Sequence, residues 1–197
     1  MTPPSRDRPD SLPAKVASAV ERLARARRSE SQAVATRHGL TTLQLDLLGV
    51  LAHGPPPDPS VGRLAAEVGV TQPTATDSLR TLVDKGLAER RRDPADGRRS
   101  TIELTGAGRR LAEEVARADD QLVTAVASLP PDVQEAALEA LLAIIARLVH
   151  TGAIDVARTC LTCHHHRQDG ATHHCTLLDI ELPPAELRVN CPDHRAA

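Results

Sequence analysis

Residues 60–87 read Ser60-Val-Gly-Arg-Leu-Ala-Ala-Glu-Val-Gly-Val-Thr-Gln-Pro-Thr-Ala-Thr-Asp-Ser-Leu-Arg-Thr-Leu-Val-Asp-Lys-Gly-Leu87. Apolar residues recur at helical spacing before Gly69 and again after it, which predicts two short helices joined by a glycine turn. Thr71 is a good N-cap for the second helix, and Pro73 falls in its first turn, where a missing N–H costs little. This order of elements is a helix-turn-helix, predicted here at about residues 60–84.

A β-hairpin is predicted directly after this motif, at about residues 87–104. Residues 87–92 and 99–104 can pair as strands across Asp93-Pro-Ala-Asp-Gly-Arg98, a run dense in turn-forming residues. Either half alone has an ordinary structural interpretation, a packing unit for the helices or a solvated edge for the hairpin. Together, and in this order, they favour DNA binding, because arginines at a hairpin tip suit the narrow minor groove.

The candidate DNA contacts follow from this arrangement. Polar side chains in the first turn of the second helix can face base edges in the major groove or nearby phosphates. An acid in that helix, Asp77, either accepts a hydrogen bond from a cytosine amino group or repels phosphate, and both interpretations stay open. The predicted DNA-binding residues are Thr71, Gln72, Pro73, Thr74, Thr76 and Arg80 on the helix, and Arg92, Asp96, Arg98 and Arg99 in the hairpin.

At these residues the chain resembles the MarR family of winged helix-turn-helix regulators, over about residues 16–151. The resemblance implies that Asp96 holds the hairpin, called the wing, and that its partner Arg98 enters the minor groove. It also implies a homodimer. The chain departs from the family at Asp77, where a basic residue is common. The marks that carry the resemblance are Leu64-Ala65, Gly69-Val70-Thr71, Gly86-Leu87, Asp96-x-Arg98 and Leu104-Thr105-x-x-Gly108.

Composition limits the partners and the fold class. With 197 residues the chain has room for one DNA-binding domain and an appendage, and its formal net charge of −2 gives no global basic field. It contains no Phe, Tyr or Trp. Single-stranded nucleic acid usually stacks on such rings, so duplex DNA is the favoured partner. We expect a mainly α fold with a small β wing, a helical dimerisation region and a short metal-stapled C-terminal segment.

Three regions are predicted along the chain: a disordered lead at 1–13, the MarR-like domain at 14–152 and a Cys/His-rich segment at 153–197. Thr41 and Gln44 form a capping-box signature, Thr105 is predicted to cap a helix that runs to Val126, and a last helix follows Pro131. The last helix is apolar around most of its circumference. It is either a central core helix or, as we prefer, a dimer interface shared with the first helix. A two-fold dimer would read a near-palindromic operator.

All four cysteines lie in the segment 153–197, which we call the tail. The pair Cys160-x-x-Cys163 is the usual chelating knuckle, and Cys175 and Cys191 can complete four-coordination, with His174 or His194 as alternates. The residues between Cys175 and Cys191 can supply a short strand and turn but little core, so the tail needs a staple to fold. The run His164-His165-His166 is expected to be surface polar residues.

The bound group is predicted to be an iron–sulfur cluster, slightly favoured over zinc. One close cysteine pair with two isolated cysteines resembles the spacing in some high-potential iron–sulfur proteins, and four thiolates are the usual cluster ligands. A structural zinc ion stays open, as does a thiol switch that closes a disulfide.

The predicted function is a homodimeric, sequence-specific double-stranded DNA-binding regulator, a repressor, whose tail senses redox or metal state. The alternative is a thiol- or metal-dependent oxidoreductase, or an oxidant sensor that does not act through DNA. An enzyme is not expected, because the Cys-x-x-Cys pair lacks the βαβ context of thioredoxin-like proteins. No signal peptide or membrane span is visible, so a cytoplasmic location is expected.

Overall fold

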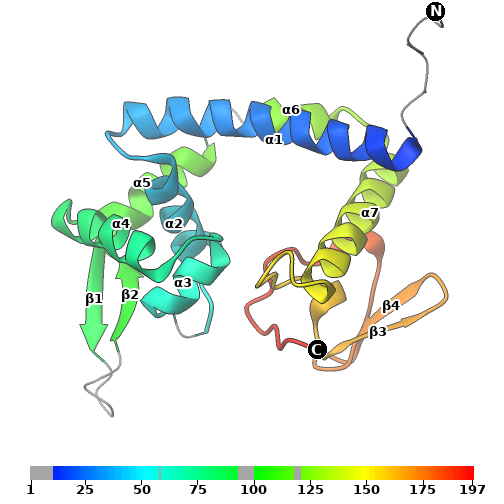
Figure 1. Ribbon diagram of the computed structural model, residues 1–197. Coiled ribbons are helices and arrows are strands. Elements are labelled where there is room, and N and C mark those ends of the chain that lie inside the picture. Colours follow the sequence, from blue (N-terminus) through cyan, green and yellow to red (C-terminus); the bar gives the residue numbers. More distant parts are fainter. Residues whose placement is uncertain (1–10, 58, 93–99, 118–120) are drawn as a thin grey trace, which may run out of the picture. The chain divides into compact units, whose positions relative to one another are not determined.

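The computed structural model describes residues 11–57, 59–92, 100–117 and 121–197, and Figure 1 shows its ribbon. The chain divides after Thr42 into two compact units, and each is described by itself. Seven α-helices, a two-stranded sheet and a three-stranded sheet make up these residues, which confirms the mainly helical class with a small β part. In the described ranges, no helix combines the length and apolarity needed to cross a bilayer.

The first unit consists mainly of α1, Leu12–Arg37. This helix begins two residues before the predicted start at Ala14, because Pro13 is tolerated in a first helical turn. Residues 1–10, the rest of the predicted disordered lead, lie outside the described residues. Apolar side chains along α1 are 39 % to 74 % exposed, so the helix carries a row of hydrophobic residues in contact with water: Leu12, Val16, Val20 and Leu23.

The second unit contains the predicted helix-turn-helix, which is confirmed as the second and third of its first three helices. It contains α2 (Thr42–His53), α3 (Val61–Glu67) and α4 (Gln72–Asp84). Gly69 has φ +67°, a left-handed conformation that explains a glycine at the turn between α3 and α4. The small side chain of Ala65 is buried and lets these two helices pack closely. The fully buried leucines of the three helices are Leu47, Leu48, Leu64, Leu79 and Leu82.

The wing consists of β1 (Ala88–Arg92) and β2 (Ser100–Leu104), which pair antiparallel (Figure 1). Ile102 is buried, and its N–H donates to the carbonyl of Pro59 at 3.0 Å. This bond ties the wing to the segment before α3. The two predicted strands are confirmed at residues 88–92 and 100–104, while the predicted turn at 93–98 and Arg99, predicted to start the second strand, lie outside the described residues.

Thr105 connects three elements at the base of the wing. Its hydroxyl donates to the carbonyl of Gly86 at 2.7 Å and accepts from the N–H of Gly108 at 3.1 Å. It therefore caps α5 (Gly106–Arg117), as predicted. Its own N–H donates to the carbonyl of Leu87 at 3.1 Å. The end of α4, the start of β1 and the first turn of α5 are thus held together by one residue.

The helix predicted to run from Thr105 to Val126 is described as α5 and α6 (Gln121–Ala127), because residues 118–120 lie outside the described residues. The predicted last helix is confirmed as α7, Pro131–His150, with Asp132 in its first turn. Leu142 is its one buried residue. Other apolar side chains of α7 are 38 % to 43 % exposed: Val133, Leu141, Ile144 and Leu148.

The tail, yellow to red in Figure 1, has more structure than the sequence predicted. The short strand and turn expected between Cys175 and Cys191 are present as β5 and the turn before it, but β3 and β4 were not expected, and the three strands form an antiparallel sheet in the order β3-β4-β5. The expectation of little core was also wrong, because Leu142 of α7 packs in one cluster with Cys160, Leu182 and Leu187. The tail elements are η1 (Cys160–Thr162), β3 (His166–Asp169), β4 (Thr172–Cys175), β5 (Ile180–Leu182) and η2 (Pro184–Glu186).

Candidate nucleic-acid interface and four-cysteine pocket

The first turn of α4 presents a row of exposed polar side chains. Thr71 is its N-cap, and the hydroxyl accepts from the N–H of Thr74 at 3.4 Å. The two threonine hydroxyls lie 2.8 Å apart. Gln72 and Pro73 follow the cap and are exposed. This exposed helix start has the form that helix-turn-helix proteins direct at base edges.

Two predicted contacts further along α4 already have partners within the chain. The hydroxyl of Thr76 donates to the carbonyl of Gln72 at 2.8 Å, so its hydrogen is used inside the helix. Arg80 lies 3.4 Å from Asp77, and both side chains are largely exposed. An exposed pair of this kind is weak, so a DNA phosphate can compete for the arginine.

The wing carries acids as well as arginines. The guanidinium of Arg91 lies 2.9 Å from Glu89 and 3.1 Å from Glu103. The hydrogen bond to Glu89, followed by the charge of Glu103, raises the pKa of Arg91. The local positive charge of β1 is therefore smaller than its arginine count suggests. Arg92 ends β1, and the predicted contacts Asp96, Arg98 and Arg99 lie outside the described residues.

All four cysteines line one pocket in the tail, and its empty volume of about 360 Å³ is partly open to solvent. Cys160 comes from η1, Cys175 ends β4, and Cys191 follows η2. Cysteines from three separate parts of the tail thus line the same pocket. We call this the four-cysteine pocket; its other lining residues are His165, Leu177, Leu178, Leu182, Arg188 and Asp193.

Backbone hydrogen bonds fix the cysteines in place. The N–H of Cys163 donates to the carbonyl of Cys160 at 3.0 Å, which closes the tight turn of η1. A reciprocal capping box between Thr159 and Thr162 supports the same turn. The N–H of Cys191 donates to the carbonyl of Arg158 at 2.8 Å. The turn that carries Cys160 and Cys163 and the backbone of Cys191 are therefore held by hydrogen bonds within the tail.

Two donors of Arg188 approach the sulfur atoms. Its backbone N–H lies 3.2 Å from Sγ of Cys160, and its Nη1 lies 3.9 Å from Sγ of Cys191. Burial raises the pKa of the Cys160 thiol, and the hydrogen bond from Arg188 opposes this shift. Burial therefore favours the neutral thiol of Cys160, whereas the N–H of Arg188 is a donor that favours its thiolate.

The two alternate ligands do not line the pocket. Nε2 of His194 lies 3.0 Å from Oγ1 of Thr162, and burial lowers the pKa of His194. His174 lies 3.5 Å from Asp179 on the neighbouring turn. Their positions are structural, so the sequence interpretation of these histidines as alternates is not supported by the pocket lining.

His165 was missed as a site residue. It lines the pocket, and its Nε2 is buried without a hydrogen-bond partner. Interpreting the run 164–166 as surface polar residues was therefore wrong for this position. His165 lies in a turn that the N–H of His166 closes by donating to the carbonyl of Cys163 at 3.0 Å, so no strand or helix periodicity in the sequence indicated it.

His166 is also not a plain surface residue. Its Nε2 lies 2.9 Å from Nδ1 of His173, whose Nε2 lies 3.0 Å from Oε1 of Glu139 on α7. Burial lowers the pKa of His166, with the neighbouring His173 adding to the shift. This chain of polar groups fastens β3 and β4 to α7.

As the side chains stand, the described part of the chain holds no group of three or more His, Cys, Asp or Glu residues that could grip a metal ion. The four cysteines are therefore gathered around one pocket without being closed on a common point. The chemistry of the lining nevertheless fits a sulfur-ligated group: four thiols, one unpartnered imidazole nitrogen and two N–H donors directed at sulfur.

A helix-turn-helix with an exposed, capped second helix and a two-stranded wing defines the class of the second unit. It is a winged helix-turn-helix domain. Residues 38–99 match the model of the MarR family, so this part of the chain is a MarR-family domain and the resemblance seen in the sequence is confirmed. The match covers less than half of the chain, and it does not favour the enzyme alternative.

Solved structures of the family share the fold. S. aureus MepR in a DNA complex is 24 % identical, with 68 % of this chain and 97 % of that chain covered and a TM-score of 0.57. S. aureus MarR in complex with salicylate and kanamycin is 19 % identical, with coverages of 72 % and 95 % and a TM-score of 0.61. A MarR-family regulator from Silicibacter pomeroyi is 24 % identical, with coverages of 70 % and 92 % and a TM-score of 0.59. No curated protein matches the chain.

Proposed function

We propose that this protein is a sequence-specific double-stranded DNA-binding regulator that acts as a homodimeric repressor. The observation that carries the proposal is the exposed, capped N-terminus of α4 beside a paired wing. The fold shared with a MepR–DNA complex supports it. An occupied operator excludes polymerase, which is the simplest route from binding to repression.

Each element has a distinct task in this proposal. Thr71, Gln72 and Thr74 face the major groove from the first turn of α4, where side chains reach base edges. Arg80 leaves Asp77 for a phosphate. Asp96 holds the wing, while Arg98, helped by Arg92 and Arg99, contacts the minor groove and its phosphates.

The dimer is proposed from the exposed apolar side chains of α1 and α7. Val20 on α1 is 39 % exposed, and Ile144 on α7 is 42 % exposed. Rows of such residues on two helices commonly mark an interface with a second copy. Two α4 helices related by a two-fold axis would read half-sites about 10 base pairs apart, so the operator should be near-palindromic.

The DNA proposal is tested by selecting a duplex from a random pool and measuring its Kd at several salt concentrations. Gln72→Ala is expected to weaken binding roughly 5- to 150-fold and to relax the base preference at one position, as loss of a base contact does. Arg80→Ala is expected to weaken all sequences alike and to lower the salt slope by about 1 per protomer.

Arg167→Ala is the matched control, because this exposed arginine donates to carbonyls inside the tail. Its Kd and salt slope should equal those of the unaltered protein. Equal effects of all three substitutions would refute the proposed α4 interface. The absence of any salt-dependent duplex binding would refute DNA binding altogether.

We further propose that the four-cysteine pocket holds an iron–sulfur cluster, slightly favoured over zinc, and that its occupancy is the sensed state. Support comes from the four thiols that line one pocket, since four thiolates are the usual ligands of such a cluster. Cys160, Cys163, Cys175 and Cys191 would be the ligands, and Arg188 would donate to the sulfur atoms of two of them. A cluster would supply sensitivity to oxidants, whereas zinc would supply a redox-inert staple.

Absorbance and metal analysis of protein purified without oxygen test the bound group. The chain has no Trp or Tyr, so protein background above the far ultraviolet is low. Iron with a broad visible absorption is the expected result. A colourless protein that carries zinc would instead identify a structural zinc ion. Cys175→Ser should lose the metal. His174→Ala should retain it, because His174 does not line the pocket. Protein purified without oxygen that carries neither iron nor zinc would contradict the proposal.

A further inference from the structure

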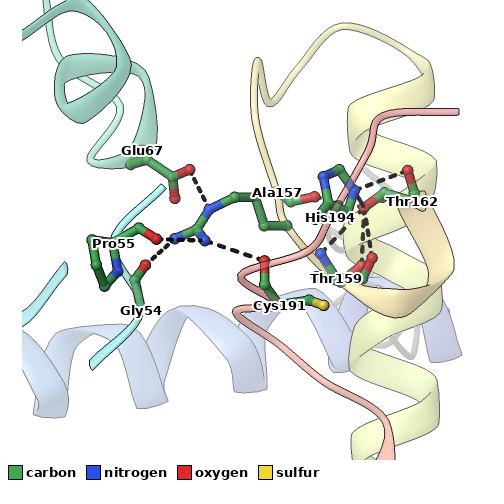
Figure 2. Close-up of polar contacts among 9 residues, drawn as sticks. Gly54, Pro55, Glu67, Ala157, Thr159, Thr162, Cys191 and His194 are labelled. Atoms are coloured by element: carbon green, nitrogen blue, oxygen red, sulfur yellow. Dashed lines mark hydrogen bonds and ion pairs between the residues drawn. The ribbon is translucent and has the colours of Figure 1, made fainter. Parts of the chain in front are cut away.

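The side chain of Arg158 lies between the four-cysteine pocket and the helix-turn-helix. It is 5 % exposed, and it precedes Cys160 by two residues. Its Nε donates to Oε1 of Glu67 at 2.5 Å, and Glu67 is the last residue of α3. A buried ion pair therefore connects the tail to the first helix of the DNA-binding motif, as Figure 2 shows.

The same guanidinium also holds the loop between α2 and α3. Its Nη1 donates to the carbonyl of Pro55 at 3.4 Å, and its Nη2 donates to the carbonyl of Gly54. The tail touches this loop at a second point, because a Cβ placed on Gly54 would stand 3.4 Å from Cβ of Asn190. Asn190 is the neighbour of Cys191, so both contacts come from the region of the pocket.

Cys191 is bound by Arg158 in two ways. The carbonyl of Arg158 accepts from the N–H of Cys191 at 2.8 Å. Nη1 of Arg158 also donates to the carbonyl of Cys191 at 3.2 Å, the contact drawn in Figure 2. Cys191 in turn lines the four-cysteine pocket. One side chain thus contacts the backbone of a pocket cysteine and the end of α3 at once.

The chemistry of arginine makes this arrangement sensitive to small displacements. A guanidinium is planar and always charged, so its donors meet four acceptors only in one geometry. A buried charge that loses an acceptor is penalised, because water does not replace the lost partner. If the backbone of Cys191 moves, Arg158 must either follow it or lose a hydrogen bond. A guanidinium that follows Cys191 changes its contacts with Glu67 and Gly54.

We propose that Arg158 couples the state of the four-cysteine pocket to the helix-turn-helix. A group bound by Cys160 and Cys191 fixes the backbone of Cys191, and so holds the guanidinium against Glu67 and the loop at 54–55; an empty pocket releases it. The inference rests on the proposed function and names the route of its regulation. Coupling of the usual size would change operator affinity roughly 5- to 150-fold between the loaded and metal-free states.

The test compares operator Kd for metal-free full-length protein with Kd after anaerobic reconstitution, either with ferrous iron and sulfide or with zinc chloride. For the unaltered protein, the operator Kd of the metal-free form and that of the loaded form should differ by a ratio of at least about fivefold, in either direction. Arg158→Lys keeps the charge but loses the planar fork, so the ratio should fall to near one while the metal content stays unchanged. Arg167→Lys should keep the ratio, because this arginine donates only to the carbonyls of His164 and His166 in the described contacts.

The ratio separates coupling from a merely structural role. A structural role would alter affinity or thermal stability equally in both states and leave the ratio as it was, which would overturn the proposal. If Arg158→Lys fails to fold, Glu67→Gln tests the same contact from α3. The amide oxygen of Gln still accepts from Nε, which keeps the local fold, but the negative charge of the pair is lost. The ratio of the two Kd values should therefore also fall, and an unchanged ratio overturns the coupling.

Other outcomes identify which proposal fails. If the unaltered protein binds its operator equally well loaded and metal-free, the coupling is refuted and the DNA-binding function stands. If neither metal enters the pocket, the coupling and the bound group are both refuted. If no duplex is bound in either state, the proposed function fails and takes the coupling with it.

Discussion

Gly108→Ala is expected to lower the free energy of unfolding by about 3 kcal/mol. A Cβ at this position would overlap the carbonyl oxygen of Leu87 and lie 3.0 Å from the carbonyl carbon and 3.2 Å from Cδ2 of Leu104. The first two are backbone atoms at the start of the wing, which cannot rotate away as a side chain tip can. The thermal midpoint should fall by roughly 6 to 12 °C, the range for a chain of this size.

Gly49→Ala is the matched control, because it places the same methyl group in the helix α2 with no atom within 4 Å. Alanine is favoured over glycine inside a helix by about 1 kcal/mol, so this variant should be unchanged or slightly more stable. The free energy of unfolding should therefore fall in Gly108→Ala and stay the same or rise in Gly49→Ala. Equal stability of the two variants would show that α5 shifts away from Leu87 without penalty.

Leu142→Ala is the second substitution with a large expected effect. It should lower the stability of the fold around this side chain by about 2 to 5 kcal/mol. Leu142 is 1 % exposed and packs with Cys160, Leu182 and Leu187, all three of which belong to the tail. The cavity should therefore loosen the tail from α7 rather than unfold the winged domain. In reduced, metal-free protein, limited proteolysis should cut first within residues 153–197, and the thermal transition of the tail should move to lower temperature.

Leu141→Ala tests the adjoining, exposed side of the same helix, because successive residues of an α-helix lie about 100° apart. This neighbour is 43 % exposed, so its truncation should leave the tail intact. If α7 contributes to the proposed dimer, Leu141→Ala should instead shift the monomer–dimer equilibrium measured by sedimentation. A tail released equally by both substitutions would contradict the division of α7 into a tail-bearing face and an exposed face.

The winged domain could be predicted closely, because its signals are local. Helical periodicity, the cap at Thr71 and the turn at Gly69 each involve residues a few positions apart, and the structure confirms all three. The role of Thr105 as a helix cap was also local and was confirmed. Its bond to Gly86 joins residues 19 apart in sequence, and no pattern in the chain indicates it.

The tail was predicted less well, because its order depends on distant partners. Composition alone identified the four cysteines as one site, and they do line one pocket. The sheet and the core were missed because Leu142 of α7, which lies outside the tail, supplies the apolar surface that the tail lacks. Arg158 gave no signal at all: its carboxylate partner, Glu67, is 91 residues away.

The bonds of Thr105 have a consequence for the proposed reading of DNA. Because one residue bonds to the end of α4, the first residues of the wing and the start of α5, the two elements proposed to contact DNA are joined at their base. Under the proposed function, α4 and the wing would therefore move together, and the bonds from Arg158 to the loop at 54–55 and to the end of α3 are where a signal from the tail would reach them.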